Sequence, residues 1–351
     1  MTSPETISMR KFIVALVLLL AVVFIFLRLS ELQNIADTLR KSNWVFLSIA
    51  ILFECVWLYN LSTTFGALYH LVELREGKLQ LFLMATAANF VNVVAPSGGI
   101  GGVAVFIDSA KRRDLSTGRV MVVGALYVLY DYAALMCILA LGFVVLIRRN
   151  TLEASELVAA AILMVLALGM AALFYLGYKS AEQLGRVLAW LSRLVNRLVR
   201  PFIHRDYLKE ENAHLFAREI AEGIILIRGK RKELLWPFLF SLNNKALLVC
   251  VMTFTFLTVG TPFTVGSVVG GVSIAGLFLI VSPTPSGVGI VEGILPFALN
   301  MLRVPLGASV LITLIYRAVT FWLPLLVGVV TFRVLGNSKK LPLVEENKQE
   351  K

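Results

Sequence analysis

The sequence predicts an all-α polytopic membrane protein with six full spans and two broken re-entrant hairpins in an inverted repeat. Three observations lead to this prediction. Hydrophobic residues make up 58% of the 351 residues and charged residues only 16%, a balance that excludes ordinary soluble domains. Apolar runs recur at about the 20 residues that cross about 30 Å of hydrocarbon. Two further runs are interrupted by Gly and Pro, which a continuous helix tolerates poorly.

The charge balance favours a membrane surface over nucleic acid. Lys and Arg number 33 against 22 Asp and Glu, for a net charge of +11. The excess lies between apolar runs, as in cytoplasmic loops beside anionic lipid, and no basic region stands apart from them. The three cysteines, Cys55, Cys137 and Cys250, fall inside apolar runs, where they act as small hydrophobes. We therefore expect no nucleic-acid partner, disulfide, metal or cofactor.

The first expected span is Phe12 to Leu29, which follows Arg10 and Lys11. It is too long for a signal-peptide core and no small-x-small cleavage site follows it, so it is interpreted as a retained helix with a cytoplasmic amino terminus. The other uninterrupted runs are Trp44 to Leu68, Val120 to Ile147, Leu157 to Tyr178, Leu234 to Val259 and Leu306 to Phe332.

Each broken region is predicted to form two helical arms around a non-helical joint. The first, Leu79 to Ile107, is broken between Ala95 and Gly102, and the second, Val265 to Leu302, between Ser282 and Gly289. If the first hairpin enters from the cytoplasm and the second from outside, three basic segments face the cytoplasm, as the positive-inside rule requires. They are Lys111 to Arg113, the stretch from Arg186 to Lys232, and Lys339 with Lys340. The first arm is long enough to nearly span, which leaves a single crossing there as an alternative.

Each half of the chain then reads span, span, hairpin, span, in opposite orientations, a design typical of transporters. The halves are residues 10–150 and 155–335 of one transmembrane domain, 1–335, followed by a disordered cytoplasmic tail, 336–351. Local matches support the pairing: Pro96-Ser97-Gly98 with Pro285-Ser286-Gly287, and Tyr130-Asp131 with Tyr316-Arg317.

A polar linker, residues 180–232, joins the halves. Its apolar residues recur at steps of three and four, with arginines on another face. This pattern predicts a cytoplasmic amphipathic segment that either binds acidic headgroups or ties the halves together.

Asp131 and Arg317 are the strongest binding candidates, because ionisable side chains inside spans are costly and usually face a cavity or a partner. They are expected to approach each other or to line one cavity, with Arg317 binding an anionic headgroup; a structural ion pair is the alternative. Glu292, beyond the second break, could carry a coupling proton or cation, or hold Arg317. Lys245, Asn89, Asn92 and Glu54 are weaker candidates, since such groups often serve only interhelical contacts.

The broken loops themselves are the other binding candidates. Glycine allows close backbone approach, and the N-terminus of a following helix offers free N–H groups suited to phosphate; simple flexibility at a kink is the alternative. The residues concerned are Pro96, Ser97, Gly98, Gly99, Pro285, Ser286, Gly287 and Gly289, with Tyr130 and Tyr316 further along. No metal-ligand spacing among the three histidines and no nucleophile elbow is found, so an enzyme is not expected.

These motifs resemble the lysylphosphatidylglycerol synthase transmembrane family, the flippase-like region of the multiple peptide resistance factor. The resemblance rests on Pro96 to Gly99, Tyr130-Asp131, the run from Pro285 to Gly293, and Tyr316-Arg317, and it extends from about Lys11 to Leu335. It implies a bacterial or archaeal plasma-membrane protein that moves lipids or lipid-linked intermediates between leaflets. The resistance factor also has an aminoacyl-transferase domain without a counterpart here, so lysyl transfer is not expected.

The expected function is therefore transport of an anionic phospholipid or a polyprenyl-phosphate-linked glycolipid. An enzyme or accessory subunit of envelope glycolipid assembly, and an ion-coupled small-molecule carrier, are the alternatives. The expected partners are the bilayer and the lipid substrate; a second copy of the chain or envelope-synthesis enzymes are left open.

Overall fold

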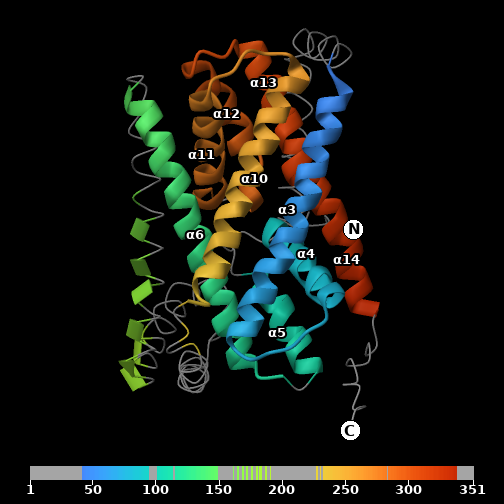
Figure 1. Ribbon diagram of the computed structural model, residues 1–351, viewed down its shortest axis with the longest axis vertical. Helices are drawn as coiled ribbons and strands as arrows, with labels where there is room; N and C mark the ends of the chain where they lie inside the picture. Colours follow the sequence, from blue (N-terminus) through green and yellow to red (C-terminus); the bar gives the residue numbers. More distant parts are fainter. Residues whose placement is uncertain are drawn as a thin grey trace, which may run out of the picture.

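The computed structural model describes residues 42–94, 101–113, 115–148, 232–282 and 284–337, together with scattered positions between 161 and 230. Within these residues every regular element is helical (Figure 1). The elements are α3 (Trp44–Leu71), α4 (Lys78–Val94), α5 (Val103–Arg112), α6 (Thr117–Arg148), α10 (Leu235–Val259), α11 (Val265–Val281), the 3-10 turn η1 (Pro285–Gly287), α12 (Ile290–Met301), α13 (Leu306–Arg317), the π-helical η2 (Ala318–Trp322) and α14 (Leu323–Asn337).

Four helical stretches are long and apolar enough to cross a membrane: α3, α6, α10 and the continuous run from α13 to α14. They begin and end within a few residues of four of the six expected spans. The other two expected spans, Phe12 to Leu29 and Leu157 to Tyr178, lie outside the described residues, apart from isolated positions in the second. The linker 180–232 and the tail fall there as well, so the six-span count stays a prediction.

Local sequence explains where several helices begin and end. The side chain of Asn43 accepts a hydrogen bond from the Val45 N–H at 3.0 Å and caps the start of α3. Thr264 and Ser267 form a capping box at the start of α11, which satisfies N–H groups that have no partner within the helix. Gly260 ends α10 with φ of 71°, a conformation that glycine adopts without steric penalty.

The last span departs from regular α-helix in its middle. The predicted span, Leu306 to Phe332, lies in one continuous helical stretch, Leu306–Gly336. Within it α13 ends at Arg317, and the five residues of η2 are π-helical before α14 continues. A π-helical turn inserts an extra residue and shifts the facing of the side chains around it, and such turns often occur at functional sites. Arg317 lies directly before this turn.

The two broken regions form pairs of short helices at opposite ends of the molecule (Figure 1). The pair α4 and α5 lies at the end where α3 finishes, and the pair α11 and α12 lies at the other end, beside α13. The longest of these helices has 17 residues, which reach about 26 Å and fall short of the hydrocarbon core. The second joint is described and is non-helical, as expected; residues 95–100 of the first joint lie outside the described residues.

The helices that the predicted repeat would pair run in opposite directions (Figure 1). In that view α3 descends while α10, which packs along it, ascends; α6 ascends while the α13 to α14 run descends. The hairpins pack crosswise, since α4 contacts α14 and α11 contacts α6. A buried hydrogen bond of 2.6 Å from Asn60 to Asn244 joins α3 to α10.

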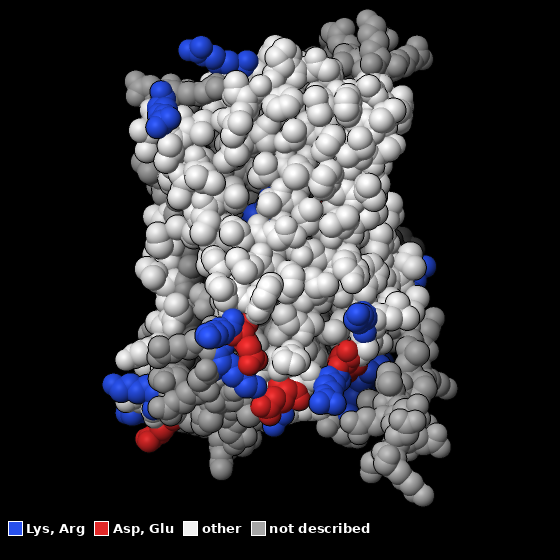
Figure 2. Space-filling model, in the orientation of Figure 1, with Lys and Arg blue, Asp and Glu red and all other residues white. Residues whose placement is uncertain are grey.

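A few basic side chains lie at one end of the molecule, but the acidic side chains and most of the basic ones in this view gather at the other end (Figure 2). Ion pairs link the loop after α3 to neighbouring segments there: Glu76 with Arg113 at 2.7 Å, and Glu73 with Lys230 at 3.0 Å. The hydrogen bond from Lys230 lowers the pKa of Glu73. The side of the molecule above these pairs is almost free of charge in this view, as a surface in contact with lipid should be.

Candidate functional site: a polar cavity between the two halves

A cavity of about 530 Å³ lies among helices of both halves. Its walls are contributed by α3, α4, α6 and α10, by the second hairpin, and by α13 with η2. Aliphatic residues such as Leu135, Ile138 and Val272 form much of the lining, but the cavity also contains side chains that carry charge. An apolar pocket with a few convergent polar groups is typical of a ligand site.

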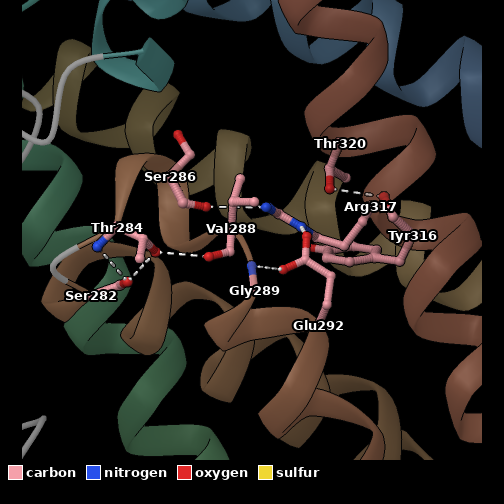
Figure 3. A network of polar contacts seen from close by, with 9 residues as sticks. All are labelled: Ser282, Thr284, Ser286, Val288, Gly289, Glu292, Tyr316, Arg317 and Thr320. Atoms are coloured by element: carbon pink, nitrogen blue, oxygen red, sulfur yellow. Dashed lines mark hydrogen bonds and ion pairs between the residues drawn. The ribbon is translucent and has the colours of Figure 1, made fainter. Parts of the chain in front are cut away.

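Arg317 is the central cation of this site (Figure 3). Its Nε donates to Glu292 Oε1 at 2.6 Å, and its Nη2 donates to the carbonyl oxygen of Ser286 at 3.1 Å. The guanidinium also lies 4.5 Å from the ring centroid of Phe321. These contacts leave Nη1 without a hydrogen-bond partner in the described part of the chain. Arg317 is only 3% exposed, so its charge depends on these few groups.

The joint of the second hairpin places Ser286 and Glu292 for this task. Ser286 has φ of 47° and Gly287 of 67°, a left-handed turn that costs a non-glycine residue about 1–3 kcal/mol. Ser286 is held in this left-handed conformation, which only glycine would adopt freely. Its carbonyl oxygen accepts a hydrogen bond from Arg317. Gly289, with φ of 83°, is the N-cap residue of α12.

Glu292 serves two partners at once. Its Oε2 accepts the Gly289 N–H at 2.8 Å, closing the first turn of α12, while Oε1 accepts from Arg317. A carboxylate is also favoured here by the positive end of the helix dipole. Glu292 therefore holds Arg317, which is one of the two roles expected for it. The other role, carrying a proton or cation that drives transport, stays a prediction.

Asp131 forms the second ion pair of the cavity. Its Oδ1 lies 2.6 Å from Nζ of Lys245, and both residues lie near the middle of their helices, α6 and α10. Asp131 and Arg317 thus line one cavity, which was one of the two expected arrangements. The other alternative, a direct pair between them, is not what the structure has, because each is paired with another residue.

The remaining expected site residues are divided between the cavity and its supports. Asn92 lines the cavity, and its side chain accepts the Gly102 N–H at 2.6 Å, which ties α4 to the start of α5. Tyr316 lines the cavity, whereas Tyr130 packs against the hydrophobic cluster around Phe65. Pro285, Gly287 and Gly289 shape the second joint but do not line the cavity, whereas Ser286 between them does. Pro96, Ser97, Gly98 and Gly99 lie outside the described residues.

The structure places two residues of α3 in the cavity wall. Glu54, ranked as a weak candidate, lines the cavity and is 1% exposed. Trp57, one turn further along α3, lines it as well and was not considered. The carboxyl at Glu54 in an otherwise apolar run was the available signal, but nothing in the sequence indicated which face of α3 meets the cavity. Among the described residues no group of three or more His, Cys, Asp or Glu is placed to hold a metal.

Two comparisons with known proteins bear on the family of the chain. A curated relative, a UPF0104 membrane protein from Methanothermobacter thermautotrophicus, is 21% identical over 317 residues, which cover 89% of this chain and 92% of the relative. The family model described as the lysylphosphatidylglycerol synthase TM region matches residues 12–328. That match extends over both halves and both hairpins, and the chain belongs to the lysylphosphatidylglycerol synthase TM region family.

Proposed function

We propose that the protein is a flippase-like transporter that moves an anionic phospholipid or a polyprenyl-phosphate-linked glycolipid between membrane leaflets. The single observation that carries the proposal is Arg317: a buried guanidinium at the wall of a cavity between the two halves, whose Nη1 has no hydrogen-bond partner among the described residues. Membership of a membrane family related to lipid handling supports it.

In this proposal Arg317 recognises the phosphate. A guanidinium presents several donors in a fixed plane, and such pairs with phosphate are among the strongest hydrogen bonds in proteins. Glu292 and Ser286 hold the guanidinium while the cavity is empty, so that no unpaired charge is buried. An arriving phosphate binds Nη1 without first breaking either contact.

The hairpins supply the movement. The second hairpin carries both Glu292 and Ser286, so its position is coupled directly to Arg317 and to the π-helical turn that follows it. We propose that the two hairpins open alternately toward opposite leaflets, within six spans arranged as an inverted repeat of residues 10–150 and 155–335. The opposite directions of α3 and α10 support this arrangement (Figure 1).

The charged end of the molecule would face the cytoplasm. Arg113, Arg119 and Lys230 lie there, and cytoplasmic loops carry the excess of basic residues. With six spans both termini would be cytoplasmic, and the expected location is the plasma membrane. No transferase activity is proposed for the chain.

The test is headgroup translocation by the purified protein in proteoliposomes, with fluorescent phosphatidylglycerol beside a fluorescent neutral lipid. Wild type should move the anionic lipid faster, and Arg317→Gln and Asp131→Asn should abolish that advantage. Arg148→Gln, at the exposed end of α6 and away from the cavity lining, is the matched control and should behave as wild type. Equal movement of the anionic lipid by folded wild type and Arg317→Gln would refute the role of Arg317.

A further inference from the structure

Three buried polar atoms of α3 have no hydrogen-bond partner among the described residues: both carboxyl oxygens of Glu54 and the indole Nε1 of Trp57. Both residues line the central cavity. A buried donor or acceptor without a partner costs about 1–3 kcal/mol, and more when it is charged. The ion pairs of the site, Glu292 with Arg317 and Asp131 with Lys245, do not involve these atoms.

The spacing of the two residues lets one ligand group serve both. Residues three apart on a helix are neighbours on one face, with Cβ atoms about 5–6 Å apart. In the structure these polar atoms are covered, so a ligand reaches them when the side chains turn toward the cavity that they line. The two residues therefore form one small polar area on an otherwise apolar stretch of α3.

The chemistry of the pair selects the ligand group. The carboxyl of Glu54 accepts hydrogen bonds, whereas the indole of Trp57 only donates one. An ammonium group would satisfy Glu54 and leave Trp57 unpaired, and a second phosphate would find no Lys or Arg on α3 to offset the loss of its hydration. A hydroxyl group donates to one and accepts from the other, and two neighbouring hydroxyls would also use the second carboxyl oxygen.

We propose that Glu54 and Trp57 form a hydroxyl-binding subsite, and that the transported headgroup is a phosphate-linked polyol, such as a glycerol or a sugar. The inference rests on the proposed function, because it takes Arg317 as the phosphate site of the same cavity. Glycerol and sugar headgroups share this chemistry and would reach the subsite from a phospholipid and a polyprenyl lipid respectively.

The test compares two phospholipids that differ only in their hydroxyls. Phosphatidylglycerol and phosphatidylpropanol carry the same phosphate charge and headgroups of nearly the same size. Binding of each to the purified protein in a neutral detergent is measured by titration. Wild type should bind phosphatidylglycerol about tenfold more tightly, the ratio that about 1.4 kcal/mol of hydrogen bonding gives.

Conservative variants assign that preference to the two residues. Glu54→Met and Trp57→Phe, which remove the acceptor and the donor, should each remove most of it while leaving the affinity for phosphatidylpropanol near that of wild type. Trp236→Phe, an exposed tryptophan of α10 outside the cavity lining, is the matched control and should keep the full preference. Gel filtration checks that each variant is folded.

The outcomes separate this inference from the proposed function. Equal binding of the two lipids, or binding of neither, overturns the subsite, as does a preference that persists in both variants. Translocation of the same lipids is measured in parallel. A binding preference without translocation by wild type would overturn the transporter proposal and leave the subsite standing. Translocation of both lipids with equal binding would overturn the subsite and leave the transporter proposal standing.

Discussion

Glu292 joins Arg317 to the start of α12: one carboxylate oxygen lies 2.6 Å from Nε of Arg317, and the other accepts the Gly289 N–H at 2.8 Å. The buried cation of the last span is thereby held by the first turn of the second hairpin. Because both contacts use one side chain, a displacement of the hairpin changes the surroundings of Arg317 at once. This relationship makes Glu292 the most informative residue to change.

Glu292→Gln should lower the free energy of unfolding by about 3 kcal/mol, because it leaves the Arg317 charge buried without a counter-charge. Thermal or denaturant unfolding in detergent measures this. Glu233→Gln is the control, since Glu233 is about half exposed and faces His70 at 3.9 Å; it should change stability by less than about 0.5 kcal/mol. The double variant Glu292→Gln with Arg317→Gln should be destabilised by less than the sum of the singles. Strict additivity would contradict the pair.

The pair of Asp131 and Lys245 should behave as a coupled unit as well. Removing either charge leaves the other in the cavity wall, so Asp131→Asn and Lys245→Gln should each lower stability, by about 2 kcal/mol. The double variant should recover about half of the summed loss, measured in the same unfolding assay. If transport also returns in the double variant, the pair is structural. If transport stays absent while stability returns, Asp131 or Lys245 contacts the substrate.

Much of the helical layout follows from apolar length and from Gly and Pro. Four spans were predicted to within a few residues, and the joint near Ser286 was predicted because Pro and Gly interrupt an apolar run. These features are local, since a helix needs only its own backbone hydrogen bonds to exist in a membrane. Asp131 and Arg317 were predicted to line a cavity because an ionisable side chain inside a span is costly unless it faces a cavity or a partner, and both do line it.

The side chains that pair across helices could not be predicted, because the hydrophobicity of a span does not show which faces of two helices meet. The partner of Asp131 is Lys245, 114 residues away, and both were ranked without reference to each other. Glu54 and Trp57 lie on a helix with almost no amphipathic pattern, since lipid and protein interior are equally apolar. The π-helical turn after Arg317, by contrast, has a local cause: Pro324 has no N–H to donate to the carbonyl of Thr320, and the Leu323 N–H bonds to Ala318 instead.

Outside the spans, the ion pair of Glu76 and Arg113 should anchor the first hairpin. The two side chains are 3% and 17% exposed and lie 2.7 Å apart. Arg113→Met should cost about 3 kcal/mol of unfolding free energy, because it leaves the Glu76 carboxylate buried and unpaired. Arg112→Met is the matched control: Arg112 pairs with Asp108 one turn away, but both are more than half exposed, and its loss should cost less than about 0.5 kcal/mol.

The loss of unfolding free energy caused by Arg113→Met should also depend on pH, and it should grow as the pH rises. Burial raises the pKa of Glu76, and Arg113 acts against that rise. Without Arg113 the folded-state pKa of Glu76 rises further, so the folded variant binds a proton that the unfolded chain releases. Stability of the variant relative to wild type should therefore be highest near about pH 4 and fall as the pH rises through the folded-state pKa. A pH-independent difference would argue that the lost stability comes from packing of the arginine stem.

The contact between the first hairpin and the last span depends on a glycine. A Cβ added at Gly328 of α14 would lie 2.5 Å from Cβ of Phe90 and 3.0 Å from the carbonyl oxygen of Thr86, both on α4. Thr86 also donates to Thr331 at 3.0 Å across this contact. Gly328→Ala should therefore force the helices apart and lower the free energy of unfolding by about 1–3 kcal/mol.

The same helix provides the control for this last prediction. A Cβ at Gly336 would meet nothing within 4 Å, so Gly336→Ala should be neutral or slightly stabilising, because alanine favours helix over glycine by about 1 kcal/mol. Thermal unfolding of both variants in detergent decides the matter. If α4 must move relative to α14 during transport, Gly328→Ala should also slow translocation in proteoliposomes more than Gly336→Ala does. Equal stability of the two variants would contradict the close approach of the helices at Gly328.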